Sequence, residues 1–357
     1  MNRFSLPHSS PDRSLHPERR AALEALRQLA REMAGKKLPG ERELSQRLHI
    51  SRQQLRGLLD VLETEGVVER RQGSGTYATD ARHFELHHVG LVIDAHLKLG
   101  NDPFFSLLTE RLQLGLQAAG IHCVVERTGG ASRPRFLGNG VIALGLAGLG
   151  ALSHLRVEDP PALSLLAEEQ YPHHFAGAVS VLLMEDHGAG LEAGKRAIEE
   201  GCRRLFFFGR GHIPASRGRW EGIQQAALRA EEPITAEIHE CAMNFNAGRT
   251  AGQAMAEQLR GVPVREVGLI ASNDWLAVGL RAGLTESGSP LRERPIYSFD
   301  GLSIAQDPAQ NIRSLCFPVS IFVEDTLAEL RRLTGQRIGR VIRYNHSGWS
   351  DRLPPDP

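Results

Sequence analysis

The chain of 357 residues contains few cysteines and few aromatic residues, and it has no excess of charge of either sign. None of its four cysteines shows the CxxC or Cys-His spacing of metal ligands, which argues against a zinc site and against a disulfide-rich secreted scaffold. We therefore expect no metal and no cofactor. The four thiols are spread along the chain at Cys123, Cys202, Cys241 and Cys316.

Long apolar runs are also missing. The first twenty residues are polar and interrupted by proline, without the apolar core of a secretory signal, and no later run has the length of a membrane span. These absences predict a cytoplasmic protein that has no membrane partner. We expect residues 1–17 to form a disordered lead-in before the first domain.

The charges are unevenly distributed along the chain, although the formal net charge is zero. Residues 1–80 contain 14 Lys and Arg against 11 Asp and Glu, and the remainder contains 28 against 31. A neutral whole chain argues against a nonspecific nucleic-acid coat protein, whereas a basic head fits docking on phosphates. The length exceeds that of one small module and predicts two or more domains.

Residues 38–79 are the most informative segment, because their pattern predicts a helix, a short turn, a second helix and a basic hairpin in that order. Glu43 to Leu48 has the spacing of a short helix, and His49-Ile50 forms the turn. Ser51 is placed to cap the next helix with its side-chain oxygen. Leucines at spacings of three and four predict the packed face of that helix, namely Leu55, Leu58, Leu59 and Leu62.

The opposite face of the second helix is polar and carries Arg52, Gln53, Gln54 and Arg56. Arginine can donate two hydrogen bonds to guanine in the major groove, and glutamine can pair with adenine. In an isolated helix, the same face is equally well explained as a solvated surface. The following residues 67–71 alternate like a strand, and Gln72 to Gly75 supplies a hairpin turn, so the order favours a winged helix-turn-helix.

Residues 19–79 closely resemble the DNA-binding domain of the GntR family of bacterial transcription regulators, in the runs LPGEREL, ISRQQLRGLL and EGVVERRQGSGTYA. Gly40 stands where the family usually has Ser, and Gln53-Gln54 replaces the usual Thr-Thr pair, which leaves the base preference open. We place the DNA-binding domain at 18–79 and a linker at 80–87. The resemblance implies DNA contacts from Arg42, Ser51, Arg52, Gln53, Gln54, Arg56, Gln72 and Gly73.

From about residue 88, apolar strands alternate with amphipathic helices, the pattern of an α/β fold with parallel sheets covered on both faces. The length suits two doubly wound lobes, in which ligands bind at the carboxyl ends of the strands. The predicted strands are 88–93, 121–126, 141–144, 178–183, 204–208, 267–271 and 296–299. The predicted helices are 105–119, 188–200, 218–230 and 274–287.

Polar and aromatic side chains follow several of these strands, namely Phe104, Phe105, Asp186, Arg219, Asn273 and Asp300. Carboxylates, an amide and a guanidinium beside aromatic rings suit a hydroxyl-rich solute. Simpler structural roles remain open for each of them. Asp186 or Asp274 could cap the helix that follows, a phenylalanine could belong to the core, and Arg219 could pair only with a carboxylate.

Residues 88 to about 345 resemble the effector domain of LacI-type repressors, which has the type I periplasmic-binding-protein fold. The matching runs are VGLVID, NDPFF, NGVIALG, RRLFFFG, RWEGIQQAAL, LIASNDWLAVGLRAGLTESG and IYSFDG. Asp186-His187 replaces the common DN pair, which leaves the ligand open, and residues 129–171 match least. The resemblance implies effector contacts from Phe104, Phe105, Arg219, Asn273 and Asp300.

A GntR-type head joined to a LacI-type domain resembles the architecture of arabinose-responsive repressors. The sequence therefore suggests a transcription regulator, specifically a repressor, that binds palindromic operator DNA as a homodimer. We expect an effector-binding and dimerisation domain at 88–347, followed by a tail at 348–357. A sugar is the expected effector, with purines and amino acids as open alternatives.

An enzyme and a solute-binding protein of the same two-lobed fold are the competing hypotheses. The nearest phosphate-loop pattern fails because Ala189 replaces its first glycine and Arg196 its Ser or Thr. The sequence has no GxSxG or HExxH motif, and its histidine pairs lack a helical metal-binding spacing. We therefore predict no catalytic residues. A solute-binding protein would have no use for the DNA-binding head.

Overall fold

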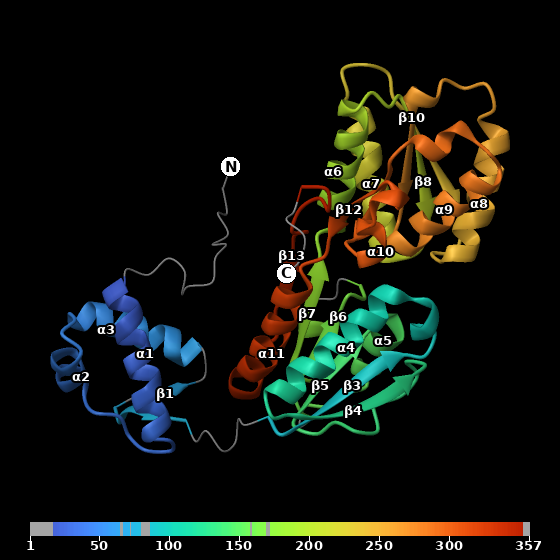
Figure 1. The fold of residues 1–357 in the computed structure, drawn as a ribbon. Coiled ribbons are helices and arrows are strands. Elements are labelled where there is room, and N and C mark those ends of the chain that lie inside the picture. Colours follow the sequence, from blue (N-terminus) through green and yellow to red (C-terminus); the bar gives the residue numbers. More distant parts are fainter. Residues whose placement is uncertain are drawn as a thin grey trace.

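A computed structural model describes residues 17–64, 67–71, 73–79, 86–157, 159–168 and 172–352. Figure 1 shows a small head at the N-terminal end of the chain and two α/β lobes formed by the remainder. Residues 1–16 of the predicted lead-in, most of the predicted linker and the last five residues lie outside the described residues, whereas Pro17 already belongs to the first helix. No helix in the described part of the chain is long and apolar enough to cross a membrane.

The head combines three helices with a two-stranded antiparallel hairpin. Its core is formed by leucines from all three helices, and Leu55, Leu58 and Leu59 of the third helix are fully buried. The second helix begins two residues earlier than the sequence predicted. The elements are α1 (Pro17–Glu32), α2 (Glu41–Arg47), α3 (Arg52–Thr64), β1 (Val68–Arg71) and β2 (Gly75–Ala78).

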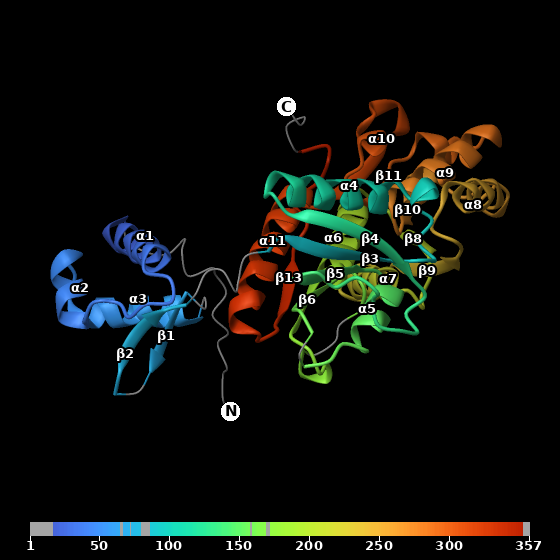
Figure 2. The ribbon, with the colours of Figure 1, turned by 90° about the horizontal axis from the view of Figure 1, so that it is seen from below.

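The first lobe is built on a six-stranded parallel sheet with the strand order β13-β7-β6-β5-β3-β4. Helices α4 and α11 pack side by side, and α5 packs on the strands β3, β5 and β6 (Figure 2). Its strands are β3 (His88–Asp94), β4 (His122–Thr128), β5 (Gly140–Leu144), β6 (Ala162–Leu165), β7 (Val179–Met184) and β13 (Val341–Tyr344). Its helices are α4 (Pro103–Ala118), α5 (Leu146–Leu152) and α11 (Val319–Gln336).

The second lobe is built on a five-stranded parallel sheet with the order β12-β11-β10-β8-β9. Helices α6 and α7 pack together, as do α8 and α9. The strands are β8 (Arg204–Gly209), β9 (Thr235–Glu240), β10 (Val267–Ala271), β11 (Ile296–Asp300) and β12 (Ile312–Cys316). The helices are α6 (Asp186–Glu199), α7 (Pro214–Leu228), α8 (Phe245–Gln258), α9 (Asp274–Glu286) and α10 (Ser303–Gln306).

Both faces of each sheet are buried, as the runs of apolar residues predicted. In β3, Leu91 packs in the core formed with α4 and α11, whereas its neighbour Val92 packs in the core that contains α5. In β8, Phe206 and Phe207 likewise belong to cores on opposite faces. Because successive strand residues point to opposite sides, each sheet needs apolar residues on both faces.

The predicted fold class is confirmed, and every helix and strand predicted after residue 88 is present within a few residues of its expected bounds. The sequence pattern missed β6, β9, β12, β13, α5, α8, α10 and α11 as separate elements. One boundary also differs from the prediction. Trp349, assigned to the tail, is buried and pairs with Leu315 of β12, so the second lobe includes it.

A buried carboxylate joins α11 to the edge of the first sheet. Glu329 accepts hydrogen bonds from Ser180 in β7, at 2.6 Å, and it forms ion pairs with Arg332 and Arg340, at 2.6 and 2.7 Å. Burial raises the pKa of Glu329, but the hydrogen bonds from Arg332, Ser180 and Arg340 outweigh burial and lower the pKa below its usual value of 4.5.

We predict that Glu329→Ala lowers the free energy of unfolding by about 3 kcal/mol at neutral pH, because it leaves two guanidinium groups without their carboxylate. Since the pKa is lowered by folding, this stabilisation is present above pH 4.5 and is lost as the pH falls through the lowered value. Urea unfolding measures the effect. The exposed Glu324 on the same helix is the control, and an equal loss in Glu324→Ala would contradict the assignment.

Candidate DNA-binding surface and interlobe site

The polar helix of the head begins with a reciprocal cap. The Ser51 hydroxyl accepts a hydrogen bond from the backbone N–H of Gln54, at 3.2 Å, and the Gln54 side-chain oxygen accepts one from the N–H of Ser51, at 2.9 Å. This is a capping box, with the Ser and Gln three residues apart. The predicted cap is therefore present. It also engages the Gln54 oxygen, which leaves only the amide nitrogen of that side chain to contact a base.

The predicted DNA-contacting face of α3 is exposed. Arg52, Gln53, Gln54 and Arg56 all point away from the leucine core. Arg56 differs from Arg52 because its Nε donates to Glu41 of α2, at 2.9 Å. Arg42 and Arg52 are exposed and form no ion pair with any described residue. These two guanidinium groups are thus the ones already available to a DNA duplex.

The wing is held against α3 by an arginine on its inner face. Arg70 of β1 forms ion pairs with Asp60, at 2.5 Å, and with Glu63, at 3.6 Å. The turn contains Gly73, which has a φ of 74° that favours glycine. Gly73 is exposed at the wing tip, as predicted, whereas Gln72 lies outside the described residues.

The two lobes are joined by three crossovers of the chain, which hydrogen bond to one another and to the strand ends. The first runs from β7 to α6, and Glu185 within it donates to the Tyr344 carbonyl, at 2.9 Å. The second follows β12, where Phe317 donates to the carbonyl of Asp300, at 3.0 Å. The third follows β13, where Ser347 donates to the Cys316 carbonyl, at 2.8 Å. The carboxyl ends of the strands therefore surround a common junction.

Arg219 of α7 and Asp186 of α6 meet beside this junction. The Arg219 Nε donates to the Asp186 carboxylate at 2.8 Å, and its Nη1 donates to the carbonyl of Ser272, at 2.5 Å. The guanidinium also lies 4.5 Å from the ring centroid of Phe299. Asp186 is the first residue of α6 and makes no cap hydrogen bond, so the helix-capping interpretation of this residue was wrong.

Asp300 ends β11 in a conformation that is rare for a residue with a side chain. Its φ is 112°, and its carboxyl group is buried. Burial, together with the nearby Asp274 carboxylate, raises the pKa of Asp300 well above its ordinary value, against the opposing effect of Arg219. Burial likewise raises the pKa of Asp274, to about 6. The Asp102 carboxylate of the first lobe also contributes to the raised pKa of Asp300.

Asn273, rather than Asp274, caps α9. Its side-chain oxygen accepts from the N–H of Leu276, at 2.8 Å, and its side-chain nitrogen donates to the Met243 carbonyl, at 3.3 Å. Asp274 is fully buried and accepts from Ser298, at 2.5 Å, so the capping interpretation of Asp274 was wrong. Both polar groups of Asn273 already have protein partners, and a ligand would have to share them.

The two predicted phenylalanines lie on the first-lobe side. Phe104 and Phe105, at the start of α4, make an edge-to-face contact with ring centroids 5.3 Å apart. Phe104 makes a second edge-to-face contact, at 5.0 Å, with Phe317 of the second crossover. Both are only partly buried and pack on the first-lobe core, so they have a core role in addition to any exposed ring surface.

His346 of the third crossover was missed by the sequence analysis. Its ring packs against Phe299, with centroids 6.0 Å apart, and its buried Nε2 has no hydrogen-bond partner among the described residues. Burial and the charge of Arg219 lower the pKa of His346 to about 3, so the ring is neutral at physiological pH. No motif marks this residue, because its position depends on how the crossover returns to the second lobe.

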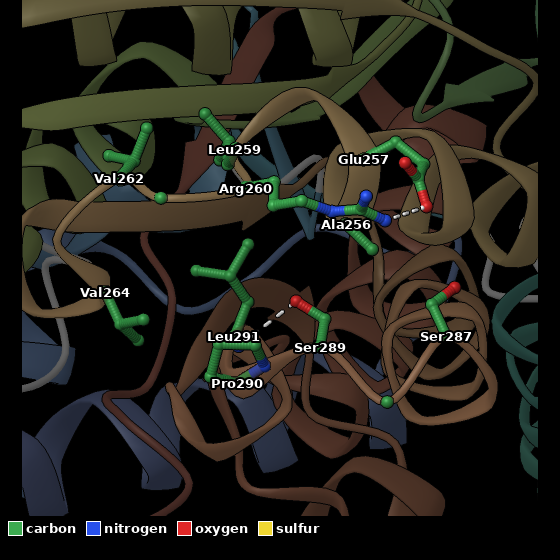
Figure 3. A pocket seen from close by; sticks show the side chains of 12 residues that line it. Ala256, Glu257, Leu259, Arg260, Val262, Val264, Ser287, Ser289, Pro290 and Leu291 are labelled. Carbon is green, nitrogen blue, oxygen red and sulfur yellow. Dashed lines mark hydrogen bonds and ion pairs between the residues drawn. The ribbon is translucent and has the colours of Figure 1, made fainter.

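A cavity of about 180 Å³ lies elsewhere, at the C-terminal ends of α8 and α9 (Figure 3). Leu259, Val262 and Leu291 give it an apolar lining, and the ion pair between Arg260 and Glu257 lies at its side. Its lining residues 256–264 come just before β10 in the chain, so the cavity lies at the amino ends of the strands. None of the predicted effector residues lines it. Among the described residues, no group of His, Cys, Asp and Glu is arranged to hold a metal ion.

Comparison with known proteins agrees with both halves of this description. Residues 20–78 match the model of the bacterial regulatory proteins of the gntR family, so this segment is a GntR-type DNA-binding domain. No curated protein matches the chain. The sequence expectation for the head is therefore confirmed by the family model.

The two-lobed part is similar to solved structures of LacI-type regulators, which shows the fold. A LacI family regulator from Enterococcus faecalis with bound ribose has a TM-score of 0.59 and 16% identity, over 73% of this chain and 96% of that one. The dimeric Lac repressor with an 11-residue C-terminal deletion gives 0.57 and 14%, over 75% and 100%. The Cra regulator from Pseudomonas putida in complex with fructose 1-phosphate gives 0.54 and 14%, over 76% and 100%.

We predict that Ser51→Ala lowers the stability of the head by about 1 kcal/mol, because it removes the cap of α3. Gly40, the N-cap of α2, provides the opposite test. An added side chain there meets no atom within 4 Å, and a φ of −64° suits serine. Gly40→Ser should therefore stabilise the head by about 0.5 kcal/mol. Calorimetry of the full chain measures both, and equal stability of Ser51→Ala and wild type would contradict the capping assignment.

Proposed function

We propose that this protein is a sequence-specific DNA-binding transcription regulator, a repressor, whose DNA affinity is controlled by a sugar or sugar derivative bound between the two lobes. The observation that carries the proposal is one chain that joins a capped and exposed recognition helix to a two-lobed ligand-binding fold. Such a regulator acts where the DNA is, so we place it in the cytoplasm. The proposal assigns it no catalytic activity.

The DNA-reading residues in this proposal are those of α3, supported by Arg42 and by the wing. Arg52 is exposed and unpaired with any described residue, so it can make a bidentate contact with guanine without first breaking an ion pair. Arg56 would have to break its ion pair with Glu41 before its guanidinium could contact DNA. A homodimer would present two such helices to half-sites about one helical turn apart, or a multiple of it, on a palindromic operator.

The effector site in this proposal lies at the interlobe junction, where the second lobe supplies Asp186, Arg219 and Asp300. Phe104 and Phe105 would supply ring surface from the first lobe, and Asn273 would share its amide. Polar groups beside aromatic rings fit the hydroxyl and C–H faces of a sugar. Support also comes from the relatives of this fold that bind ribose and fructose 1-phosphate.

Control of DNA binding requires that the effector bind one arrangement of the lobes more tightly than the other. The three crossovers are the segments about which the lobes would move, and the second of them is hydrogen bonded directly to Asp300. A ligand that contacts Asp300 would therefore act on a hinge as well as on a site. Coupling between such sites is typically about 1 to 3 kcal/mol.

The first test concerns the recognition helix. We expect Arg52→Ala to weaken binding to an operator selected from a random duplex library by about tenfold or more, and to relax the base preference. Arg56→Ala should have a smaller effect, because Glu41 competes for that guanidinium. Fluorescence anisotropy with the full chain measures both.

The control for this test is Arg265→Ala, which removes an exposed arginine from the second lobe. It should bind the operator as wild type does. Full operator affinity in Arg52→Ala would show that α3 is not the recognition helix.

The second test concerns the effector. We expect the melting temperature of the full chain to rise in the presence of one member of a panel of pentoses, hexoses, sugar acids and sugar phosphates. A ligand present at one hundred times its Kd adds about 2.7 kcal/mol, equivalent to several degrees. Asp300→Asn should abolish the shift and the response of DNA binding, while operator affinity without sugar remains.

The matched control is Glu257→Gln, which alters the cavity at the ends of α8 and α9. It should leave the shift unchanged. A shift that survives Asp300→Asn and disappears in Glu257→Gln would move the effector site to that cavity. The absence of any shift across the panel would reject a sugar effector.

A further inference from the structure

A short segment between α1 and α2 pairs with the outer edge of the wing through an isolated bridge. The segment before Leu38 runs antiparallel to β2, with a bridge between Lys37 and Tyr77. Leu38 donates to the Thr76 carbonyl and Ala78 donates to the Lys36 carbonyl, each at 2.8 Å. Lys37 is therefore fixed at the side of the wing by backbone hydrogen bonds.

The register of this small sheet places Lys37 on its outer face. Glu69 pairs with Tyr77 across β1 and β2, and Lys37 pairs with the same tyrosine from the other side. Paired residues share a face, and successive residues alternate. Val68 and Ala78 on the opposite face are buried in the head core, so the face with Lys37 points outward.

The side chain of Lys37 lies across the backbone of Gly75 at the wing tip. A Cβ added at Gly75 would be 2.8 Å from the Lys37 Cε and 3.4 Å from its Nζ. Gly75 itself has a φ of 113° that favours glycine, and the lysine stem passes beside its Cα. The turn from Gln72 to Gly75 has no charged side chain of its own, so Lys37 supplies the ammonium group at this tip.

Most other cations near α3 and the wing are already paired. Arg56 pairs with Glu41, Arg70 with Asp60, and Arg71 with Glu69. Arg71 also stacks over Tyr77, at 4.4 Å. Lys37 is exposed and forms no ion pair with any described residue. The backbone of Lys37 is thus fixed beside the wing, and its charge has no carboxylate partner among the described residues.

We propose that Lys37 contacts a phosphate of the DNA backbone beside the wing. The inference rests on the proposed DNA-binding function and adds a contact that is not among the predicted DNA-binding residues. Such a contact fixes the orientation of the wing on the duplex and does not read the base sequence.

The test is the salt dependence of binding of the full chain to a 30-base-pair duplex selected from a random library. Each phosphate contact contributes about 0.9 to the slope of log affinity against log salt. Lys37→Gln should reduce the slope by about one and weaken binding to different sequences by the same factor. Lys37→Arg should retain the wild-type slope.

Lys36→Gln is the matched control, because it removes the same charge from the neighbouring exposed residue, which does not share the face of Lys37. It should keep the slope of wild type. Equal slopes for wild type and Lys37→Gln, or equal reductions in both variants, would overturn the assignment of Lys37 as a specific contact. Failure of the wild type to bind any duplex would instead reject the proposed function, and the inference with it.

Discussion

The interlobe region depends on a single buried guanidinium. Arg219 joins α7 to α6 through Asp186, to the end of β10 through the Ser272 carbonyl, and to β11 through the ring of Phe299. Taking such a charge out of water is unfavourable unless a carboxylate and further acceptors compensate it. Because these partners come from different elements, the pairing fixes their relative positions. Gly190 makes this possible, since a Cβ there would clash with the Arg219 backbone.

The same guanidinium controls the charges around it. It lowers the pKa of His346 and opposes the rise in the pKa of Asp300 that burial causes. Removal of Arg219 would therefore alter both the second and the third crossover, since these residues lie on or against them. The charge of Arg219 therefore acts both on Asp300, which is proposed to bind the effector, and on His346 of the third crossover, which is proposed as a hinge. A ligand that changed the environment of Arg219 would therefore also change the interactions of the segments that connect the lobes.

The head shows which features local sequence can predict. The cap at Ser51 and the leucine stripe of α3 depend on residues within four positions of one another, and both are present. The capping box with Gln54 has the same local signature and was available from the sequence. The pairing of Arg56 with Glu41 joins residues fifteen positions apart on two helices, and no local pattern contains it.

In the lobes, strands buried on both faces were predictable because they read as continuous apolar runs. The missed strands β9 and β13 lack such a run. β9, with the sequence TAEIHE, is an edge strand with exposed residues, and its mixed composition gives a weak signal. β13 contains only four residues and joins the first sheet through a pairing with β7, far away in sequence. The exact partners of Arg219 and Asp274 likewise depend on how several strands end at one place. The polar strand ends could be predicted from the sequence, but their partners could not.

Asp300 offers the strongest argument for a role of the junction beyond stability. A residue with a side chain at a φ of 112° is strained by roughly 1 to 3 kcal/mol, and its carboxyl group is also buried near another carboxylate. Glycine would satisfy the backbone without this strain and would remove the unfavourable burial. The feature that glycine could not supply is the carboxyl group itself. Because the carbonyl of the same residue accepts the hydrogen bond from Phe317, a contact with this carboxyl group would act on strained backbone at the second crossover.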